Sequence, residues 1–227
     1  MRRVKIAFLV TFVLVFLTAS IAVAVFHFER KASPVQLPSS EVREYQGEKL
    51  SSINDFAEIN SIAGIQYVDK DTYRLEISGL VANPGSYTYD QVVDNHTAYQ
   101  KVVTLNCVDG WSVTLLWEGV RVQDLIDEAQ PSPDARVLIF HAADGYTTSL
   151  PIEYFRDNNI IMAYKMNGVT IPPERGFPFM LVAESKWGYK WAKWITGIEF
   201  SSDTSYKGYW EDRGYSNIGD LNQPFLQ

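Results

Sequence analysis

Short stretches of strand-like sequence, separated by turns, recur along most of the chain and limit the folds that it can adopt. Residues 72–81 (TYRLEISGLV) alternate as a strand does, and the NPGS that follows is a turn sequence. Residues 136–151 (RVLIFHAADGYTTSLP) predict a hairpin with an Asp-Gly turn, and residues 177–200 are again strand-rich, with a break at Trp187-Gly188. Because short strands outnumber helices, we predict an α+β fold that is mostly β.

Two segments have helical character instead. Residues 87–95 (YTYDQVVDN) predict a short helix entered at Thr88, with Tyr89, Val92 and Val93 facing inward. Residues 120–129 (VRVQDLIDEA) have helical apolar spacing and end before Pro131. We therefore expect two short helices beside the strands.

The first residues of the chain contain a long uncharged stretch. Residues 6–26 form an apolar run of about 21 residues, and Arg2, Arg3 and Lys5 precede it. This length matches the ~20 helical residues that cross a bilayer, and the positive-inside rule places the N-terminus in the cytoplasm. A signal peptide cleaved near Ala22-Val23-Ala24 is the alternative, but the run exceeds the usual ~7–15 apolar residues. We favour a single-pass anchor in the cell membrane that carries an extracytoplasmic domain.

Composition suggests three parts. Residues 1–28 are the predicted transmembrane anchor or signal peptide, and residues 29–52 are polar, contain Pro34 and Pro38, and predict a linker. Residues 53–227 form the predicted folded domain. The formal charge of −7 and the pI near 5.0 argue against nucleic acid as a partner, because its binders cluster Lys and Arg.

The chain has one cysteine, Cys107, in the stretch VVTLNCVDGWSV (102–113) where a strand opens into a turn. One cysteine excludes an intramolecular disulfide and an all-cysteine metal site, and the three histidines are widely separated in the sequence. A lone thiol is often a small core residue, but at a strand end it can also face a cleft and bind a soft metal. A catalytic thiol needs a base, and a thiol redox protein needs a second cysteine. Any metal here must therefore receive most of its ligands from a cofactor.

Two further segments allow more than one interpretation. Residues 187–194 (WGYKWAKW) place lysines among aromatic residues; on a strand these lysines are either edge residues that prevent aggregation or ligands of an anion. Residues 167–178 (NGVTIPPERGFP) form either a surface loop or a polar clamp that contains Arg175. Trp111, Trp117 and Tyr146 are most simply core aromatic residues.

Taken together, five stretches resemble the molybdopterin-binding domain of the sulfite oxidase family, from about Ile53 to the C-terminus. They are ISGLVANPGSYTYDQV, CVDGWSV followed by WEGVRVQDLI, GYTTSLP, MNGVTIPPERGFPFMLV with GYKWAKW, and YKGYWEDRGYS. The sequence pattern around Cys107 most resembles that of the periplasmic methionine sulfoxide reductase catalytic subunits. The resemblance implies a sulfite-oxidase-type fold in which Cys107 is the protein ligand of molybdenum, beside the dithiolene sulfurs of a single pterin.

The same resemblance assigns residues to the cofactor one at a time. Asn54 matches an Asn-rich pterin-binding stretch, and Arg175 stands where the reductases have Asn. Met180 stands where an Arg is expected, so one phosphate contact is lost. Val108, Asp109 and Gly110 replace the arginines that meet sulfite in the sulfite oxidases, which makes sulfite a doubtful substrate. The implied cofactor-binding residues are Asn54, Ala57, Glu58, Arg175, Trp191, Ala192 and Lys193.

The implied function is oxygen-atom transfer on a small sulfur or nitrogen oxide by a membrane-anchored extracytoplasmic enzyme. Its expected cofactor is molybdenum-molybdopterin, with tungsten not distinguished, and its expected partners are a small-molecule substrate, the membrane and a separate electron-transfer protein. The alternative is a binding module that keeps the fold and has lost the cofactor. The methionine at position 180, where an Arg is expected, favours this alternative.

Overall fold

The structure is a computed structural model that describes residues 40–227. The predicted anchor or signal peptide (1–28) and residues 29–39 of the predicted linker lie outside the described residues. In residues 40–227, no helix has the length and apolar composition needed to cross a bilayer.

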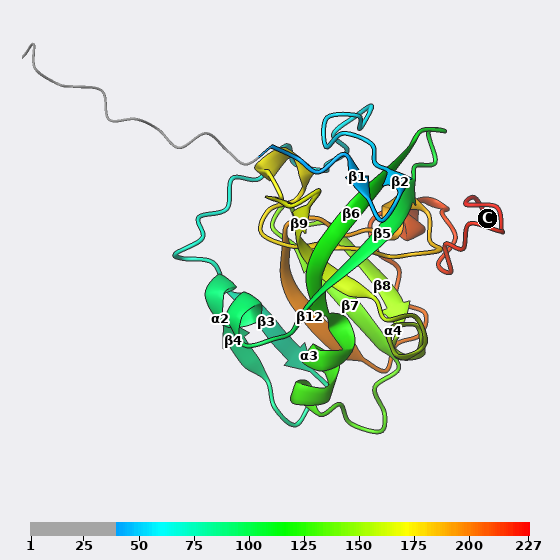
Figure 1. Ribbon diagram of the computed structural model, residues 1–227. Helices are drawn as coiled ribbons and strands as arrows, with labels where there is room; N and C mark the ends of the chain where they lie inside the picture. The colour runs from blue at the N-terminus through cyan, green and yellow to red at the C-terminus, as the bar shows by residue number, and fades with distance from the viewer. Residues whose placement is uncertain (1–39) are drawn as a thin grey trace, which may run out of the picture. The chain divides into compact units, whose positions relative to one another are not determined.

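Two five-stranded sheets form the framework (Figure 1). The first has the order β10-β9-β6-β5 with β11 paired to β9, and comprises β5 (Ala98–Asn106), β6 (Ser112–Arg121), β9 (Ile161–Met166), β10 (Val169–Thr170) and β11 (Met180–Leu181). The second has the order β4-β3-β12-β7-β8, and comprises β3 (Leu75–Gly79), β4 (Gly85–Tyr87), β7 (Val137–Ala142), β8 (Thr147–Pro151) and β12 (Ile195–Ser201). All neighbours within these sheets are antiparallel except β3 and β12, which run parallel.

The helices are short and lie beside the sheets. They are α2 (Tyr89–Asp94), α3 (Val122–Ala129), α4 (Ile152–Asn158) and the 3-10 helices η1 (Pro173–Arg175), η2 (Gly188–Lys190) and η3 (Glu211–Arg213). The mostly-β character predicted from the sequence is therefore confirmed.

The helix predicted at Thr88 is confirmed, and its start is explained by a capping box. Thr88 Oγ1 accepts a hydrogen bond from the Gln91 backbone N–H at 3.1 Å, and Gln91 Oε1 accepts one from the Thr88 N–H at 2.8 Å. Tyr89 and Val92 are buried, as their spacing predicts. The second predicted helix is α3, which ends where Gln130 adopts a left-handed conformation with φ of 52°, before Pro131.

The predicted hairpin is also confirmed, because β7 and β8 pair from Val137–Pro151 to His141–Thr147. By contrast, the WGYKWAKW segment is not a strand. The Lys190 N–H donates to the carbonyl oxygen of Trp187 at 2.9 Å, which curls residues 188–190 into η2. The interpretation of this segment as a strand was therefore wrong.

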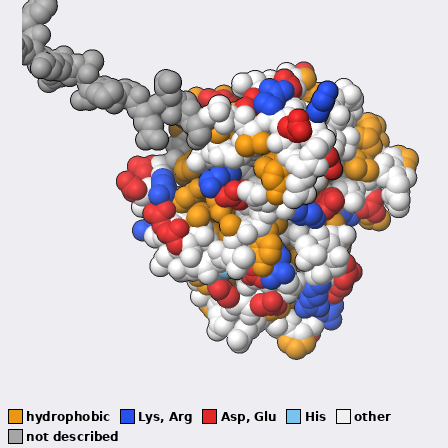
Figure 2. Space-filling model, in the orientation of Figure 1, with side chains coloured by type: hydrophobic (Ala, Val, Ile, Leu, Met, Phe, Trp, Pro, Cys, Tyr) orange, Lys and Arg blue, Asp and Glu red, His pale blue; other side chains and the backbone are white. Residues whose placement is uncertain are grey.

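Large apolar side chains fill the core. Trp117 has no exposed surface, and its indole N–H donates to the Val103 carbonyl oxygen at 3.1 Å. Phe140 and Phe155 pack at 5.7 Å between ring centroids and are equally buried. Trp117 is thus a core aromatic residue, as predicted. Acidic and basic side chains are intermixed on the face of the molecule in Figure 2.

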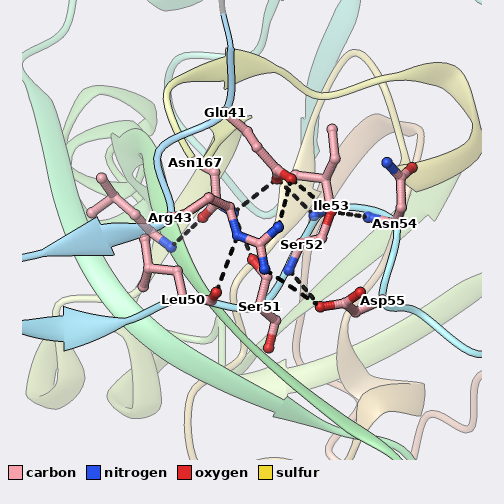
Figure 3. A network of polar contacts seen from close by, with 10 residues as sticks. Glu41, Arg43, Leu50, Ser51, Ser52, Ile53, Asn54, Asp55 and Asn167 are labelled. Carbon is pink, nitrogen blue, oxygen red and sulfur yellow. Dashed lines mark hydrogen bonds and ion pairs between the residues drawn. The ribbon is translucent and has the colours of Figure 1, made fainter.

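The end of the predicted linker belongs to the folded unit. Residues 44–49 form the hairpin of β1 (Glu44–Tyr45) and β2 (Glu48–Lys49), and a polar network attaches the residues around it to the first sheet (Figure 3). Buried Asn167 donates to Ser51 O at 2.8 Å and to Glu41 Oε2 at 3.2 Å, while its Oδ1 accepts from the Leu116 N–H at 3.0 Å. The polar composition of this segment reflects these hydrogen bonds.

The carboxyl group of Glu41 is central to that network. Burial opposes its ionisation, but hydrogen bonds from Ser52, Ile53 and Asn167 outweigh burial and lower the pKa of Glu41. The network thereby fixes the backbone that leads from residue 41 to Ile53, immediately before the segment that reaches the candidate site.

Candidate active site

A cavity of about 320 Å³ opens where loops from both sheets meet. Its lining comes from segments that are far apart in the sequence: 56–62, 105–111, 144–146, 174–175, Met180, 188–194 and 210–215. Strand ends and turns therefore supply most of the lining, while the sheets hold these segments in place.

Cys107 lies on the cavity lining, in the turn that joins β5 to β6. Its N–H donates to the Trp111 carbonyl oxygen at 2.9 Å, and its own carbonyl oxygen accepts from the Gly110 N–H at 3.1 Å. Gly110 has φ of +89°, a conformation that favours glycine, so the Asp-Gly sequence is what closes this turn. The local sequence thus fixes the thiol at the end of the strand.

Cys107 is only 7% exposed, yet its thiol has polar neighbours. Its Sγ lies 3.3 Å from Asp109 Oδ2 and 3.9 Å from Asn60 Nδ2. Burial raises the pKa of the Cys107 thiol to about 11, and the adjacent Asp109 side chain acts in the same direction. His141 does not line the cavity and instead contacts Glu199 at 2.9 Å, so it is not a base for this thiol.

Two cationic side chains also line the cavity. The Arg175 Nε donates to the Ile53 carbonyl oxygen at 2.9 Å, and its guanidinium carbon lies 4.5 Å from the centroid of the Phe56 ring. The Lys193 ammonium group donates to the Asn60 carbonyl oxygen and lies 4.4 Å from the Trp194 ring centroid. Burial lowers the pKa of Lys193 to about 8, although Asp144 opposes this shift.

Gly176 makes room for the Lys193 side chain. A Cβ atom at position 176 would lie 2.9 Å from Lys193 Cβ, and Gly176 has φ of +118°. The Trp194 N–H donates to the Gly176 carbonyl oxygen at 3.1 Å, which joins the two segments. Arg175 therefore supplies one cationic side chain of the lining, and the adjacent Gly176 leaves space for the other, Lys193.

The structure separates the predicted site residues into two groups. Cys107, Glu58, Arg175, Trp191 and Lys193 all line the cavity. Asn54, Ala57 and Ala192 lie outside its lining; the backbone N–H of Asn54 bonds to Ser52 Oγ at 3.1 Å, and its side chain makes none of the contacts drawn in Figure 3. Asn60, six residues later, is the asparagine beside the thiol.

Several lining residues were not assigned to the site from the sequence. Trp111 and Tyr146, interpreted as core aromatic residues, line the cavity. The Tyr146 hydroxyl donates to the Tyr189 carbonyl oxygen, and buried Asp144 accepts from the N–H groups of Ile62 at 3.2 Å and Tyr146 at 3.0 Å. The Asp-Gly turn of the hairpin was the available signal, because turns at sheet ends commonly carry site residues.

These residues fit an anionic, metal-bearing cofactor. The buried thiol offers a soft ligand, and two cations offer charge to an anionic group. The indole N–H of Trp111 is buried and has no hydrogen-bond partner in the described chain, so the lining holds an unused donor. Residues 40–227 contain no group of three or more His, Cys, Asp or Glu side chains placed to hold a metal ion. Cys107 is thus suited to be one ligand of a metal whose other ligands belong to a cofactor.

Fold and cavity together define a cofactor-binding domain built on two mostly antiparallel sheets. Comparison with known proteins specifies the class, because residues 62–210 match the family model described as the oxidoreductase molybdopterin binding domain. The chain belongs to this family, the molybdopterin-binding oxidoreductases of the sulfite oxidase type.

Individual relatives agree with the family assignment. The chain is 35% identical over 162 residues to the uncharacterized oxidoreductase YuiH of Bacillus subtilis, covering 70% of this chain and 81% of that protein. It is 33% identical over 157 residues to YedZ1 of Azospira oryzae, named as a proposed protein-methionine-sulfoxide reductase subunit, covering 68% and 58% of the two chains. It is also 29% identical over 163 residues to the NADPH nitrate reductase of Fusarium oxysporum, covering 60% of this chain and 18% of that one.

A solved structure supports the fold. The sulfane dehydrogenase SoxCD from Paracoccus pantotrophus matches with a TM-score of 0.60 and 23% identity, over 68% of this chain and 43% of that chain. At this identity the match supports the fold alone. Because the chain spans little over half of YedZ1 and less than a fifth of the nitrate reductase, their named activities do not transfer directly.

Proposed function

We propose that this protein is a membrane-anchored extracytoplasmic enzyme that transfers an oxygen atom to or from a small sulfur or nitrogen oxide with a molybdenum-molybdopterin cofactor. The observation that carries the proposal is the buried Cys107 thiol on the lining of a cavity that also contains Arg175 and Lys193. The relatives named as acting on methionine sulfoxide and nitrate support this substrate range.

In this proposal Cys107 is the protein ligand of the metal. Metal coordination stabilises a thiolate, so it reverses the raised pKa that burial gives this thiol. The bound cofactor supplies two-electron redox chemistry at its metal. The main-chain hydrogen bonds within turn 107–111 keep the sulfur on the lining, and the apolar Leu105 beside the turn helps to exclude water.

Lys193, Arg175 and Trp191 are proposed to hold the pterin and its phosphate. An ammonium group that is desolvated on one side binds a phosphate more strongly than a fully hydrated one. Glu58 lies on the same lining and is suited to accept hydrogen bonds from pterin N–H groups. Asn60 joins this group because it contacts both the thiol and Lys193.

The location of the enzyme is a separate part of the proposal. The uncharged run at residues 6–26, preceded by Arg2, Arg3 and Lys5, supports a single-pass anchor with the N-terminus in the cytoplasm. An anchor would keep the cavity near membrane redox proteins by raising their local concentration. Protease digestion of intact cells or spheroplasts should cleave residues 40–227 and leave a cytoplasmic reporter at the N-terminus protected.

Electrons are proposed to pass to or from a separate redox protein. With one cysteine and three histidines, residues 1–227 offer few ligands for a haem or iron–sulfur centre. We therefore propose that the partner is a protein that carries single electrons on a haem or an iron–sulfur centre.

The test is to produce the full chain in a host that makes the cofactor, and to measure molybdenum, tungsten and pterin per protein. We expect near-stoichiometric metal and pterin, with the metal lost in Cys107→Ser. Ser112→Ala, in β6 beyond the turn, is the matched control and should retain the metal. Absence of metal and pterin from the wild-type protein would contradict the proposal and favour a binding module.

A further inference from the structure

Arg175 is placed in the cavity lining by a single stretch of chain. Its Nε donates to the Ile53 carbonyl oxygen at 2.9 Å, and its guanidinium carbon lies 4.5 Å from the Phe56 ring centroid. No ion pair within residues 40–227 includes Arg175. The position of this cation therefore depends on residues 53–56, while its terminal N–H groups stay available to an anionic ligand.

Residues 53–62 have little backbone support of their own. In this stretch the one hydrogen bond between backbone groups joins the Asp55 N–H to the Ser52 carbonyl oxygen at 2.9 Å. The far end is held by a side chain, since the Ile62 N–H donates to Asp144 Oδ2 at 3.2 Å. The stretch nevertheless forms one wall of the cavity, through Phe56, Glu58, Asn60, Ser61 and Ile62. Side chains from other parts of the chain therefore position this wall.

The near end of the wall is held by Glu41 (Figure 3). The Ile53 N–H donates to Glu41 Oε2 at 2.9 Å, and the Ser52 hydroxyl donates to Glu41 Oε1 at 2.6 Å. The Asn167 side-chain amide donates to Oε2 at 3.2 Å. Hydrogen bonds to a carboxylate are stronger than those to a neutral acceptor. Ile53 is thus held on both sides, with Glu41 at its N–H and Arg175 at its carbonyl oxygen.

The residues around this carboxylate are fixed on the first sheet, and we call residues 41–52 the strap. The Ser51 N–H donates to the Thr114 carbonyl oxygen in β6 at 2.8 Å, and the Thr114 N–H donates to Ser51 Oγ at 3.0 Å. The Val42 N–H donates at 2.8 Å to the carbonyl oxygen of Asn167, in the turn between β9 and β10. The carboxylate therefore joins a well-supported strap to the start of the cavity wall.

We propose that Glu41 is a positioning residue of the cofactor site, because it fixes the Ile53 peptide that orients the Arg175 guanidinium toward the cofactor. This inference rests on the proposed function. Coupling between two binding events is reciprocal, so a bound cofactor should also hold the strap more firmly on the sheet. The strap continues directly from the first 40 residues, so the predicted anchor joins the domain at the carboxylate that positions this cofactor ligand.

The first experiment measures the rate at which pterin leaves the cofactor-loaded full chain after dilution. Glu41→Ala removes every acceptor of the carboxylate and should speed release by about tenfold or more, since a hydrogen bond to a charged group is worth about that factor. Glu41→Gln still offers an amide oxygen to the Ile53 N–H and should recover most of the loss. Thr88→Ala is the matched control: it removes a helix cap outside the cavity, so it should weaken the fold and leave pterin release unchanged.

A double variant tests whether Glu41 acts through Arg175. Arg175→Met should itself speed pterin release, and adding Glu41→Ala to it should change the rate by less than about twofold, because the group that Glu41 positions is already gone. Two independent effects, with the rates multiplying in the double variant, would overturn the positioning role. Equal release from wild type and Glu41→Ala would overturn it as well.

Trypsin cleavage of the full chain gives a readout that needs no cofactor. Arg43 and Lys49 are exposed trypsin sites within the strap. In the cofactor-free protein, Arg175→Met should speed cleavage at both sites several-fold, because Ile53 loses one of its two partners. Arg156→Met removes an exposed arginine outside the cavity and should leave these cleavage rates unchanged.

The cleavage rates also separate this proposal from the proposed function. Cofactor-loaded wild type should be cut within the strap more slowly than the cofactor-free protein. Unchanged cleavage in Arg175→Met would overturn the coupling between the strap and the cavity. If the wild-type protein contains neither pterin nor metal, the proposed function fails instead, and cleavage of the cofactor-free variants still decides whether the strap and Arg175 are coupled.

Discussion

The Lys190 ammonium group lies 2.5 Å from Glu211 Oε1 and 2.9 Å from the Ser149 carbonyl oxygen, in a part of the domain where neither charged side chain has any exposed surface. Thr148 Oγ1 donates to the same carboxylate oxygen at 2.6 Å. Burial lowers the pKa of Lys190, and the contact with Glu211 only partly opposes this shift. The pair therefore connects two segments of the cavity lining, 188–194 and 210–215, through the protein interior.

Removing one member of this pair should be costly. Glu211→Gln leaves the Lys190 ammonium buried without a counter-ion, and we expect the free energy of unfolding to fall by about 3–5 kcal/mol in urea titration. Asp90→Asn, which breaks the exposed pair between Lys70 and Asp90, should cost far less. Equal losses in the two variants would contradict the role assigned to the buried pair.

A double variant separates charge from packing. Replacing both members by apolar residues, Lys190→Met with Glu211→Leu, leaves no unpaired charge and should recover part of the stability lost in Glu211→Gln. If the double variant folds but binds less pterin than the wild-type protein, the pair also positions the lining. Stability no better than that of Glu211→Gln would mean that packing around the pair, not its charge, dominates.

Gly176 provides a second prediction, which concerns the shape of the cofactor site. Gly176→Ala should lower stability by about 1–3 kcal/mol, since φ is +118° and the new Cβ meets Lys193 Cβ at 2.9 Å. It should also reduce pterin per protein, because Lys193 must move. Gly47→Ala in the β1–β2 turn is the matched control: φ is +86° with nothing within 4 Å, so it should retain full cofactor content. Similar cofactor content in the two variants would contradict the packing role.

Local structure was largely predictable from the sequence, because short-range contacts determine it. The Thr88–Gln91 capping box and the Asp-Gly turn of the hairpin are formed by residues within a few positions of one another. The turn at Cys107 belongs to the same class, since Gly110 supplies its positive φ. For this reason the position of the thiol at the end of a strand could be inferred before the fold was known.

The remaining parts of the site depend on long-range contacts that no local pattern encodes. Lys190 and Lys193 are three residues apart in one aromatic-rich segment, yet one pairs with Glu211 in the interior and the other lines the cavity. The 3-10 helix that ends at Lys190 replaces the strand on which the sequence analysis placed both lysines. Likewise Asn60, rather than Asn54, reaches the thiol, because residues 53–62 contain no regular element whose period could fix the register.

Lys193 should make stability depend on pH in the alkaline range. Its pKa is lowered from 10.5 in an ordinary lysine to about 8 in the folded cofactor-free protein, mainly by burial. Between these two values the unfolded chain binds the proton and the folded protein does not, so this group makes the free energy of unfolding rise with pH. Lys193 adds at most about 1.4 kcal/mol per pH unit to the slope of the free energy of unfolding. It adds nothing to this slope well below pH 8, where the folded and unfolded states are both protonated.

The measurement is urea unfolding of the cofactor-free protein at pH 7, 8, 9 and 10, for the wild type, Lys193→Met and Lys49→Met. Other groups titrate in this range, so the informative quantity is the difference in slope between wild type and variant. Lys193→Met should lose the alkaline increase that Lys193 contributes, whereas Lys49→Met, which changes an exposed side chain in β2, should keep it. Parallel pH profiles for the wild type and Lys193→Met would mean that the ammonium group stays hydrated in the folded protein. A hydrated ammonium could not act as the partly desolvated phosphate ligand proposed for this position.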